Sequence, residues 1–426
     1  MKLALKNCLI INHNESFEAN IFIEDEKIKD ITNEDINGDN VIDCHNKAVL
    51  PGIIDMHVHF RDPGFEYKED IISGSKAAVA GGITTCLPMA NTYPVNDNAG
   101  MTRYMVERNR ELGLVDLLPI GSITKKMEGK ELVEMGDMLK AGAIAFSDDG
   151  LPVGNSEVMR RAMEYAKGFG SFIISHSEDR ELSQGGMINE GEISTITGLS
   201  GIPSASEDIG VARDILLAKL TKSHIHICHV SSKVALKIIK MAKKEKVNVS
   251  CEITPHHFSF TEESLLDYNT NYKMNPPLRS TEDQEMLICG MKDGTIDVIA
   301  TDHAPHHTDE KHIEFGNAAF GIIGLQTLIP LSLKLVKDKK IDLNDFVRLT
   351  SYNPSKILKL DDRGSIEKGK SADIIVIDKD KEYIFDDTIN QSKSCNNPLY
   401  NTTLKGCALY TIKKGRLVYK FPDILI

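Results

Sequence analysis

Two histidines spaced two residues apart are the first candidates for chemistry in this sequence. His57 and His59 close an apolar run within PGIIDMHVHFRDPG, residues 51–64. Side chains two positions apart on a β-strand point to the same face, so both imidazoles can bind one metal ion. Asp55 shares that face and is placed to orient one of them. Such a pair is weak evidence alone, because the chain has 14 histidines and a second His-x-His pair at 224–226.

The elements that must position these histidines follow from the rhythm of the middle of the chain. Short apolar runs recur there at 53–57, 83–88, 115–120, 143–147, 172–176, 225–229, 247–253 and 298–301. Helical patterns such as 156–169 and 205–220 lie between the runs, with Ser156 and Ser206 as expected N-caps. Strands buried on both faces that alternate with helices form parallel sheets. Eight repeats predict an α/β fold, a (β/α)8 TIM-type barrel.

An open, doubly wound sheet is the alternative architecture. The sequence contains neither a GxGxxG nor a GxxxxGK[ST] phosphate loop, which disfavours a nucleotide-binding fold of that kind. Both chain ends consist of short β patterns, such as 3–11 and 407–413, and they predict one small composite β domain. We therefore expect three segments: 1–50 and 356–426 form the small β domain, and 51–355 form the barrel.

The strand ends of the predicted barrel carry metal-ligand residue types. In such barrels the active site forms at the carboxyl ends of the strands. Five of the eight runs end in residues that bind a divalent ion such as zinc. These residues are His57 and His59, Asp149, His176, His229 and Asp302. Two of them have plainer explanations, because Asp149 precedes Gly150 in a turn-forming pair and His176 could cap a helix.

Strand parity separates His229 from the nearby histidine pair. Ile225, Ile227 and His229 share one face of their strand, whereas His224 and His226 share the other. If His229 faces the interior of the barrel, the pair faces the helices and has a structural role.

Polar residues near the same strand ends are candidates for binding a substrate. Arg61 follows the two histidines and could clamp a carboxylate through two hydrogen bonds. Asn91 and Asn275 each offer a donor and an acceptor, which suits an amide or a carboxylate. Three histidines crowd the loop 303–307, and only one of them need point inward.

Composition excludes some partners. The chain has 62 acidic and 50 basic residues, a net charge of −12, which argues against nucleic acid or an anionic membrane as the main partner. The sequence contains no run of 18 apolar residues, so we expect no membrane span. Asparagines interrupt the apolar N-terminal stretch, so we expect no signal peptide. Eight cysteines without a CxxC pair favour a reducing, cytoplasmic location.

The motifs together resemble a known family. PGIIDMHVHFRDPG, PMANT, FSDDG, SHSED, CHVSS, MNPPLR and ATDHAPH resemble those of type I dihydroorotases of the amidohydrolase superfamily, over about residues 40–375. This resemblance implies an enzyme with two Zn²⁺ ions per chain that interconverts N-carbamoyl-L-aspartate and L-dihydroorotate in pyrimidine (UMP) biosynthesis. A hydroxide between the ions would attack the ring amide carbonyl, and Asp302 would carry the proton to the leaving nitrogen.

The resemblance also implies a role for each residue. His57, His59 and Asp302 would hold one ion, His176 and His229 the other, and Asp149 would bridge both. The substrate would be bound by His59, Arg61, Asn91, Asn275, His306, Phe320 and Gly321. The polar loop 307–319 is expected to act as a mobile lid.

Alternatives within and outside this family remain open. Related hydantoinases, dihydropyrimidinases and allantoinases usually bridge their metals with a carboxylated lysine at the end of strand four, whereas this strand closes on FSDDG without a lysine. Ala319 and Gln326 depart from the Pro and Glu more usual in dihydroorotases, which affects loop detail. Another cyclic amidase, or a non-catalytic partner of aspartate transcarbamoylase, is the alternative function. We also expect a homodimer.

Overall fold

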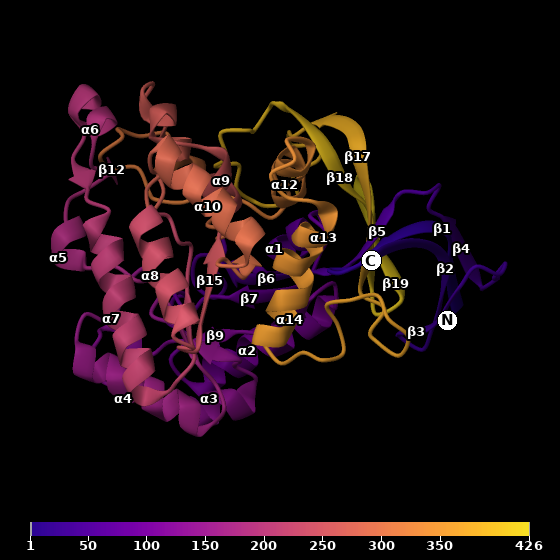
Figure 1. Ribbon diagram of the computed structural model, residues 1–426, viewed down its shortest axis with the longest axis horizontal. Coiled ribbons are helices and arrows are strands. Elements are labelled where there is room, and N and C mark those ends of the chain that lie inside the picture. The colour runs from indigo at the N-terminus through magenta and orange to yellow at the C-terminus, as the bar shows by residue number, and fades with distance from the viewer. Residues whose placement is uncertain (1, 426) are drawn as a thin grey trace.

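The computed structural model describes residues 2–425, and the two ends of the chain share one sheet within it. Nine strands form this sheet: β1 (Lys2–Ile11), β2 (Ser16–Glu24), β3 (Lys27–Thr32), β4 (Asn40–Asp43), β5 (Ala48–Pro51), β17 (Ile374–Ile384), β18 (Thr403–Lys413), β19 (Arg416–Lys420) and β20 (Asp423–Ile424). Their order is β20-β19-β18-β17-β5-β1-β2-β3, with β4 beside β1. The antiparallel pair β5–β17 joins the two ends, with Ile374 opposite Pro51. Figure 1 places this sheet at the right, apart from most of the helices.

The middle of the chain is built on parallel strands. These are β6 (Ile53–Val58), β7 (Ile83–Pro88), β8 (Asp116–Leu117), β9 (Ile120–Gly121), β10 (Ala145–Phe146), β11 (Ile173–Ser175), β14 (Ile225–Ile227), β15 (Val249–Ile253) and β16 (Val298–Ile299). They pair in the orders β6-β7-β8 and β9-β10-β11-β14-β15-β16. An isolated parallel bridge between Val58 and His303 leads from the end of this series back to β6. Because the strands are parallel, their carboxyl ends lie at one side.

Helices pack around these strands. The longer ones are α1 (Ile71–Ala80), α2 (Ala99–Leu112), α3 (Met135–Ala141), α4 (Ser156–Gly168), α7 (Ala205–Thr221), α8 (Lys233–Lys244), α10 (Thr281–Asp293) and α12 (Leu328–Lys337). Shorter ones are α5 (Arg180–Ser183), α6 (Glu192–Thr197), α9 (Pro255–Ser259), α11 (Thr308–Lys311), α13 (Leu343–Val347) and α14 (Asn353–Ile357), and a short sheet pairs β12 (Ile188–Asn189) with β13 (Gly201–Ile202). No helix among residues 2–425 is long and apolar enough to cross a membrane.

Two of the expected helix caps are wrong by one or two residues. The side chain of Asn155, not that of Ser156, accepts hydrogen bonds from the backbone of Glu157 and Val158 at the start of α4. Ser206 lies inside α7, whose first helical residue is Ala205. Asparagine and serine cap helices about equally well, so their order in the sequence did not decide between neighbours.

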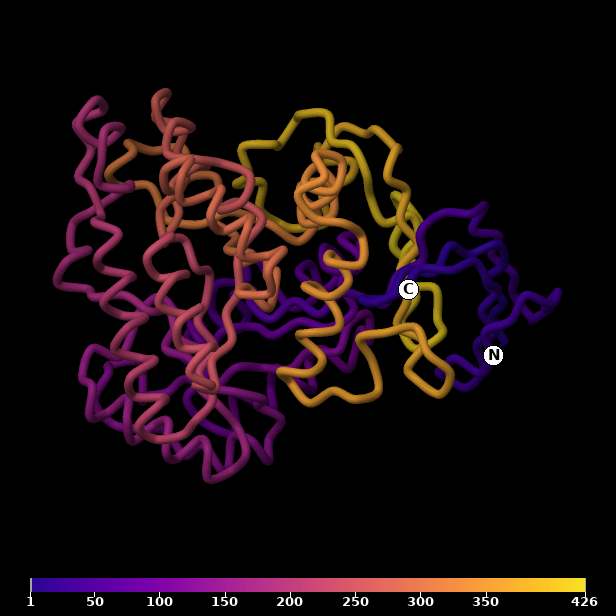
Figure 2. The backbone as a smooth tube through the Cα atoms, in the orientation of Figure 1, coloured from indigo at the N-terminus to yellow at the C-terminus, as the bar shows by residue number. Residues whose placement is uncertain are grey.

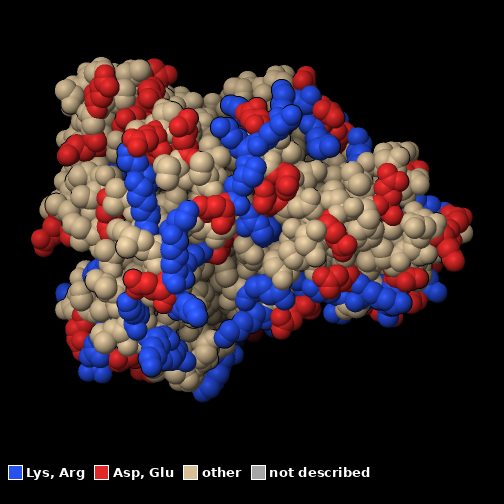
Figure 3. Space-filling model, viewed as in Figure 1, with Lys and Arg blue, Asp and Glu red and all other residues tan. Residues whose placement is uncertain are grey.

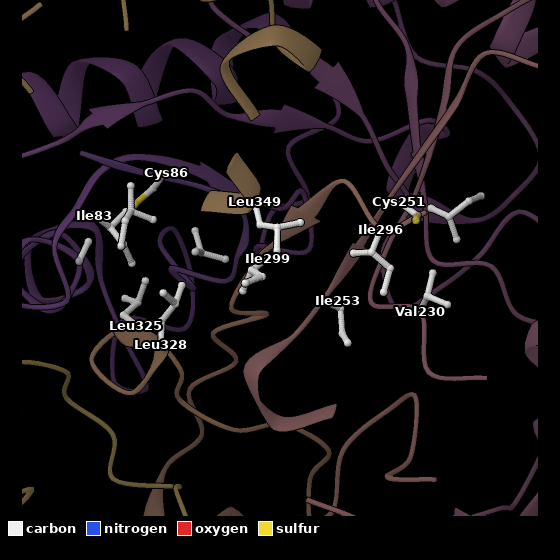
Figure 4. Close-up of a cluster of buried hydrophobic side chains, with 14 of the residues drawn as sticks. Ile83, Cys86, Val230, Cys251, Ile253, Ile296, Ile299, Leu325, Leu328 and Leu349 are labelled. Carbon is white, nitrogen blue, oxygen red and sulfur yellow. The ribbon is translucent and has the colours of Figure 1, made fainter. Parts of the chain in front are cut away.

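Both faces of the parallel strands are buried, as the apolar runs predict. One cluster of buried residues joins strand residues such as Ile83 and Ile299 to the surrounding helices (Figure 4). A second cluster contains Ile54, Leu87 and Ile174, among residues from several other strands. On the surface, acidic and basic side chains are interspersed over the face that Figure 3 shows.

A largely buried ion-pair network ties the terminal sheet to the parallel strands. Lys413 of β18 places its Nζ 2.7 Å from Asp116 Oδ2 and 2.8 Å from Asp373 Oδ2. Arg363 contacts the same oxygen of Asp116 at 2.5 Å. Burial by itself raises the pKa of Asp116, but Lys413 and Arg363 outweigh burial and hold the pKa well below its usual range. The network therefore favours the ionised carboxylate in the folded chain.

We expect the Asp116→Asn variant to lose about 3 kcal/mol of unfolding free energy at pH 7, because it leaves the buried Lys413 and the partly buried Arg363 short of one anion. A carboxyl group whose pKa is lower in the folded chain stabilises the fold above its unfolded-state pKa, about 3.9. That contribution is lost as the pH falls towards the folded-state pKa. Denaturant unfolding from pH 7 to pH 2.5 should therefore show a difference between wild type and variant that shrinks below about pH 4.

A matched control is Asp137→Asn, which removes one end of the exposed Lys140–Asp137 pair at 3.4 Å. That exchange should change the unfolding free energy by less than about 1 kcal/mol. An equal effect of both variants, or a difference independent of pH for Asp116→Asn, would contradict a stabilising role of the network.

Candidate active site

The structure brings the six predicted metal ligands together at the carboxyl ends of the parallel strands. The two carboxylate oxygens of Asp149 face different histidines. Oδ2 lies 3.6 Å from His57 Nε2 and 3.4 Å from His59 Nε2. Oδ1 lies 3.5 Å from His176 Nδ1 and 3.7 Å from His229 Nε2. Asp149 therefore separates two pairs of imidazoles.

The sixth residue, Asp302, joins only the first pair. Its Oδ1 lies 3.1 Å from His59 Nε2 and 3.4 Å from His57 Nε2. The ligand atoms of His57, His59 and Asp302 lie within 4.8 Å of one another. All six side chains are buried or nearly so.

Irregular backbone at the strand ends aims several of these side chains. Arg61, His229 and Asp302 have φ values of +58°, +32° and +46°, in the left-handed region that non-glycine residues rarely adopt. Gly150, directly after Asp149, has φ +78°, which glycine adopts without steric cost. Strained residues of this kind cluster at functional sites, where surrounding contacts enforce them.

The donor set fits a divalent metal. His57 Nε2 and Asp149 Oδ1 are buried without a hydrogen-bond partner, and leaving such atoms unpaired costs about 1–3 kcal/mol each. A cation among these atoms would satisfy both. Imidazole nitrogens and carboxylate oxygens are ligands that zinc prefers. Cys228 also approaches His57, Asp149 and His229, but burial raises the pKa of its thiol well above the usual value, which favours the neutral form.

The predicted substrate-binding residues line one cavity with the ligands. It measures about 330 Å³, and its walls include Arg61, Asn91, Asn275, His306 and the pair Phe320–Gly321. The guanidinium group of Arg61 lies 3.4 Å from His306 Nε2 and donates to the Pro305 carbonyl at 3.3 Å. Burial and then Arg61 lower the pKa of His306 to about 2, so the imidazole is neutral at physiological pH. A cation and a neutral imidazole side by side suit an anionic group of a ligand.

Only one of the three histidines in the loop 303–307 lines the cavity. His303 Nε2 lies 3.3 Å from Glu69, and its Nδ1 accepts from the Gly324 backbone. His307 caps α11 through its side chain. His306 is left to face the pocket, in accord with the expectation that one of the three points inward.

Comparison with known proteins agrees with this geometry. A family model described as "Dihydro-orotase-like" matches residues 46–235, and one described as "Amidohydrolase family" matches residues 298–419. A dihydroorotase of Geobacter sp. (strain M21) is 48% identical over 424 residues, covering 99% of this chain and 100% of that protein. A dihydroorotase of Acetivibrio thermocellus is 46% identical over 95% of both chains. The chain belongs to the dihydroorotase family.

Solved structures of other amidohydrolases share the fold of this family member. The L-hydantoinase (dihydropyrimidinase) from Arthrobacter aurescens superposes with a TM-score of 0.91 at 24% identity, covering 100% of this chain and 97% of that one. The dihydropyrimidinase from Brevibacillus agri NCHU1002 gives 0.84 at 20% identity, covering 100% and 96%. Membership of the dihydroorotase and amidohydrolase families makes the chain a hydrolase of cyclic amides.

A buried glutamate that sequence reasoning missed orients His57 in this dihydroorotase-family enzyme. Glu252 Oε1 lies 2.6 Å from His57 Nδ1, and Oε2 lies 3.0 Å from His226 Nε2. Burial by itself raises the pKa of Glu252, but His57 and His226 bring it down to about 2. The ionised carboxylate holds Nδ1 and leaves Nε2 directed at Asp149 and Asp302. A glutamate inside the apolar run VSCEI was the available signal.

The parity argument for His229 is wrong, although His229 does lie in the site. Ile225 and Ile227 belong to the cluster that includes residues of α7 and α8, so their face of β14 is turned to the helices. His226 lies on the opposite face, where it contacts Glu252. β14 ends at Ile227, and the left-handed backbone at His229 turns this side chain towards Asp149. The alternation of a regular strand does not extend to that residue.

Two other side chains make contacts that the sequence did not predict. Asp55 contacts no imidazole; it accepts from the backbone N–H of His57 at 3.2 Å and from the backbone N–H and hydroxyl of Thr301 at 3.0 and 2.6 Å. Asp55 thus ties β6 to the segment that carries Asp302. Asn91 lines the pocket, but its Oδ1 also lies 2.8 Å from His59 Nδ1.

Glu178 is a further residue that sequence reasoning missed. Its carboxylate lies 3.5 Å from His176 Nε2 and accepts from Asn275 Nδ2 at 3.3 Å. The Glu178 carboxylate therefore contacts Nε2 of His176, whereas Nδ1 of the same ring faces Asp149. The loop 307–319 is fastened by Lys311, whose Nζ donates to the carbonyls of Ala319 and Gly321 at 2.8 and 3.1 Å; lid motion of this loop stays a prediction.

Proposed function

We propose that the enzyme interconverts N-carbamoyl-L-aspartate and L-dihydroorotate in de novo pyrimidine synthesis. This proposal rests on the position of Arg61, which lines the same cavity as Asp149 and has its guanidinium group beside His306. Dihydroorotate carries a carboxylate that hydantoin, dihydrouracil and allantoin lack, and arginine binds carboxylates through paired hydrogen bonds. The near-full-length relatives named dihydroorotase support the same choice.

The residues that would hold metal follow from the two sides of Asp149. We infer that His57, His59 and Asp302 would hold one Zn²⁺ ion, that His176 and His229 would hold a second, and that Asp149 would serve both; the 3.1–3.7 Å spacings among these side chains support this division. When bound, such ions supply an activated water and polarise the amide carbonyl. Fewer than one zinc per chain after gentle purification would contradict this assignment.

The remaining steps belong to side chains of this chain. Asp302 accepts the proton of the attacking water and delivers it to the ring nitrogen as the C–N bond breaks. In the direction of ring closure it takes the proton from the ureido nitrogen. The substrate is held so that its amide carbonyl faces Asp149 and the four histidines around it, which converts binding into orientation. The residues that hold it are Arg61, Asn91, Asn275, His306 and the backbone of Phe320–Gly321.

We further infer that the two parallel sheets together form a (β/α)8 barrel. The bridge from Val58 to His303 and the TM-score of 0.91 to a hydantoinase support this inference. The barrel would span residues 51–355, and residues 1–50 and 356–426 would form the small β domain around the shared sheet. Cytoplasmic location and assembly as a homodimer remain part of the proposal, the latter testable by light scattering.

Assay of the purified chain against four cyclic amides tests the function. We expect hydrolysis of L-dihydroorotate with a kcat/KM at least about a hundredfold above that for hydantoin, dihydrouracil or allantoin, because only dihydroorotate has a carboxylate that can pair with Arg61. The assay is run with and without aspartate transcarbamoylase. Preference for an uncharged cyclic amide would contradict the substrate, and turnover only with the transcarbamoylase would indicate dependence on a partner.

A further inference from the structure

A segment from the C-terminal part of the chain reaches the mouth of the proposed active site. Residues 389–397 lie between β17 and β18, and the yellow chain of Figures 1 and 2 extends there from the terminal sheet towards the helices of the middle. Ser394 Oγ donates to the Lys68 carbonyl at 2.8 Å, and Lys393 Nζ lies 2.5 Å from Asp70. Ser392 contacts the buried carboxylate of Glu69. The segment is therefore fixed to residues 68–70, close to the strand end that carries His57 and His59.

Asn396 in this segment bonds to two walls of the cavity at once. Its Oδ1 accepts from the backbone N–H of His306 at 3.1 Å. Its Nδ2 donates to the Ala304 carbonyl at 3.0 Å and to the Gly321 carbonyl at 3.1 Å. Ala304, His306 and Gly321 all line the cavity. The side chain is 3% exposed, so both of its donor hydrogens and its acceptor serve these three backbone groups.

The two walls of the cavity, at Ala304 and Gly321, are in close contact. Gly321 has φ +138°, and a Cβ on it would stand 2.8 Å from the Ala304 Cβ and 2.9 Å from the Ala304 carbonyl oxygen. A small displacement of the backbone at this contact therefore changes the distance between His306 and Gly321. Lys311 also donates to the Gly321 carbonyl, whereas the His306 N–H has Asn396 as its partner.

We propose that Asn396 is a positioning residue for substrate binding, which sets the spacing of His306 and Gly321 at the end of the cavity that takes the substrate's carboxylate. This inference rests on the proposed function. Asn396 touches none of the six candidate metal ligands, so its effect falls on substrate affinity rather than on metal binding or proton transfer. It assigns a task in the active site to the segment between β17 and β18.

The test compares Asn396→Asp with Asn397→Asp. Asn396→Asp keeps the acceptor for His306 but places a carboxylate oxygen against two carbonyl oxygens. Asn397 is equally buried at 1% exposed, yet it donates to the Ile323 carbonyl at 2.6 Å and accepts from the Leu399 N–H at 2.8 Å, away from the cavity lining. Both exchanges introduce one buried charge in the same segment, so we expect them to destabilise the fold by a similar amount.

We expect Asn396→Asp to raise the KM for dihydroorotate about tenfold while kcat stays within about threefold of wild type, since uniform binding is what the variant loses. Zinc content per chain should equal that of wild type. Asn397→Asp should lower the melting temperature by a similar amount but leave KM unchanged. The smaller variant Asn396→Ser, which keeps one hydroxyl donor, should raise KM about threefold and provides the measurement if the aspartate variant does not fold.

Each possible result either supports or overturns the role proposed for Asn396. Unchanged KM in a folded Asn396 variant, or equal KM changes at 396 and 397, would overturn the inference. A fall in zinc content together with kcat would assign Asn396 a general structural role and overturn it as well. Absence of dihydroorotate turnover in the wild-type chain would overturn the proposed function and this inference together. If the wild-type chain turns over dihydroorotate, the variants test this inference separately from the proposed function.

Discussion

The Asp302→Asn variant is expected to lose about 10³-fold in kcat while it keeps its fold and most of its metal. Asparagine matches aspartate in shape and still offers an oxygen at the position 3.1 Å from His59 Nε2. It cannot accept a proton. Burial by itself raises the pKa of Asp302, but His57 and His59 outweigh burial and hold the pKa below its usual range, so the wild-type group is an ionised base. The measurement is kcat with dihydroorotate, together with zinc content by mass spectrometry.

Asp309→Asn in the following loop is a matched control, because that carboxylate is exposed and contacts only His307. It should leave kcat within about twofold of wild type, as surface substitutions usually do. Near-normal turnover of Asp302→Asn with full zinc content would remove the proton-transfer role assigned to Asp302.

The Asp149→Ala variant is expected to lose most of its zinc and at least about 10³-fold in activity. Asp149 stands between two pairs of buried imidazoles, with its two oxygens 3.4–3.7 Å from four ring nitrogens. Removing it would delete the carboxylate that we propose as a ligand to both ions, together with its negative charge. Zinc content and activity after dialysis against a weak chelator give the readout.

Asp149→Glu is the companion variant, because it keeps the charge but moves the carboxylate by one methylene group. We expect it to retain more zinc than Asp149→Ala and to recover little activity, since the spacing to the imidazoles changes. Full zinc binding by Asp149→Ala would contradict the bridging role and leave two separate metal sites as the explanation.

The sequence could predict which strand ends meet, because that follows from parallel geometry alone. Residues 57, 149, 176, 229 and 302 each close an apolar run, and parallel strands bring such ends to one side. It could not predict how the backbone leaves each strand. The parity argument assumed a regular strand up to His229, whereas the chain becomes left-handed there with φ +32°. A non-glycine residue in that conformation carries no mark in the sequence.

Contacts between distant segments were the other part that could not be foreseen. Glu252 is 195 positions from His57, and Asn396 is 90 positions from His306. An ionisable residue within an apolar strand signals a buried partner, so Glu252 could have been singled out but not paired. Asn396 lies in the polar stretch SKSCNNPLY, where nothing distinguishes it from Asn397. Only the fold tells them apart.

The pairing of β5 with β17 has a consequence for how the chain is made. Leu50 meets Ile375 across this pair, so the ribosome must add more than three hundred residues after β5 before its partner strand exists. Throughout that time β5 presents an unpaired backbone edge, which is a template for association with other chains. Nascent chains stalled before β17 should therefore depend on chaperones far more than full-length chains do.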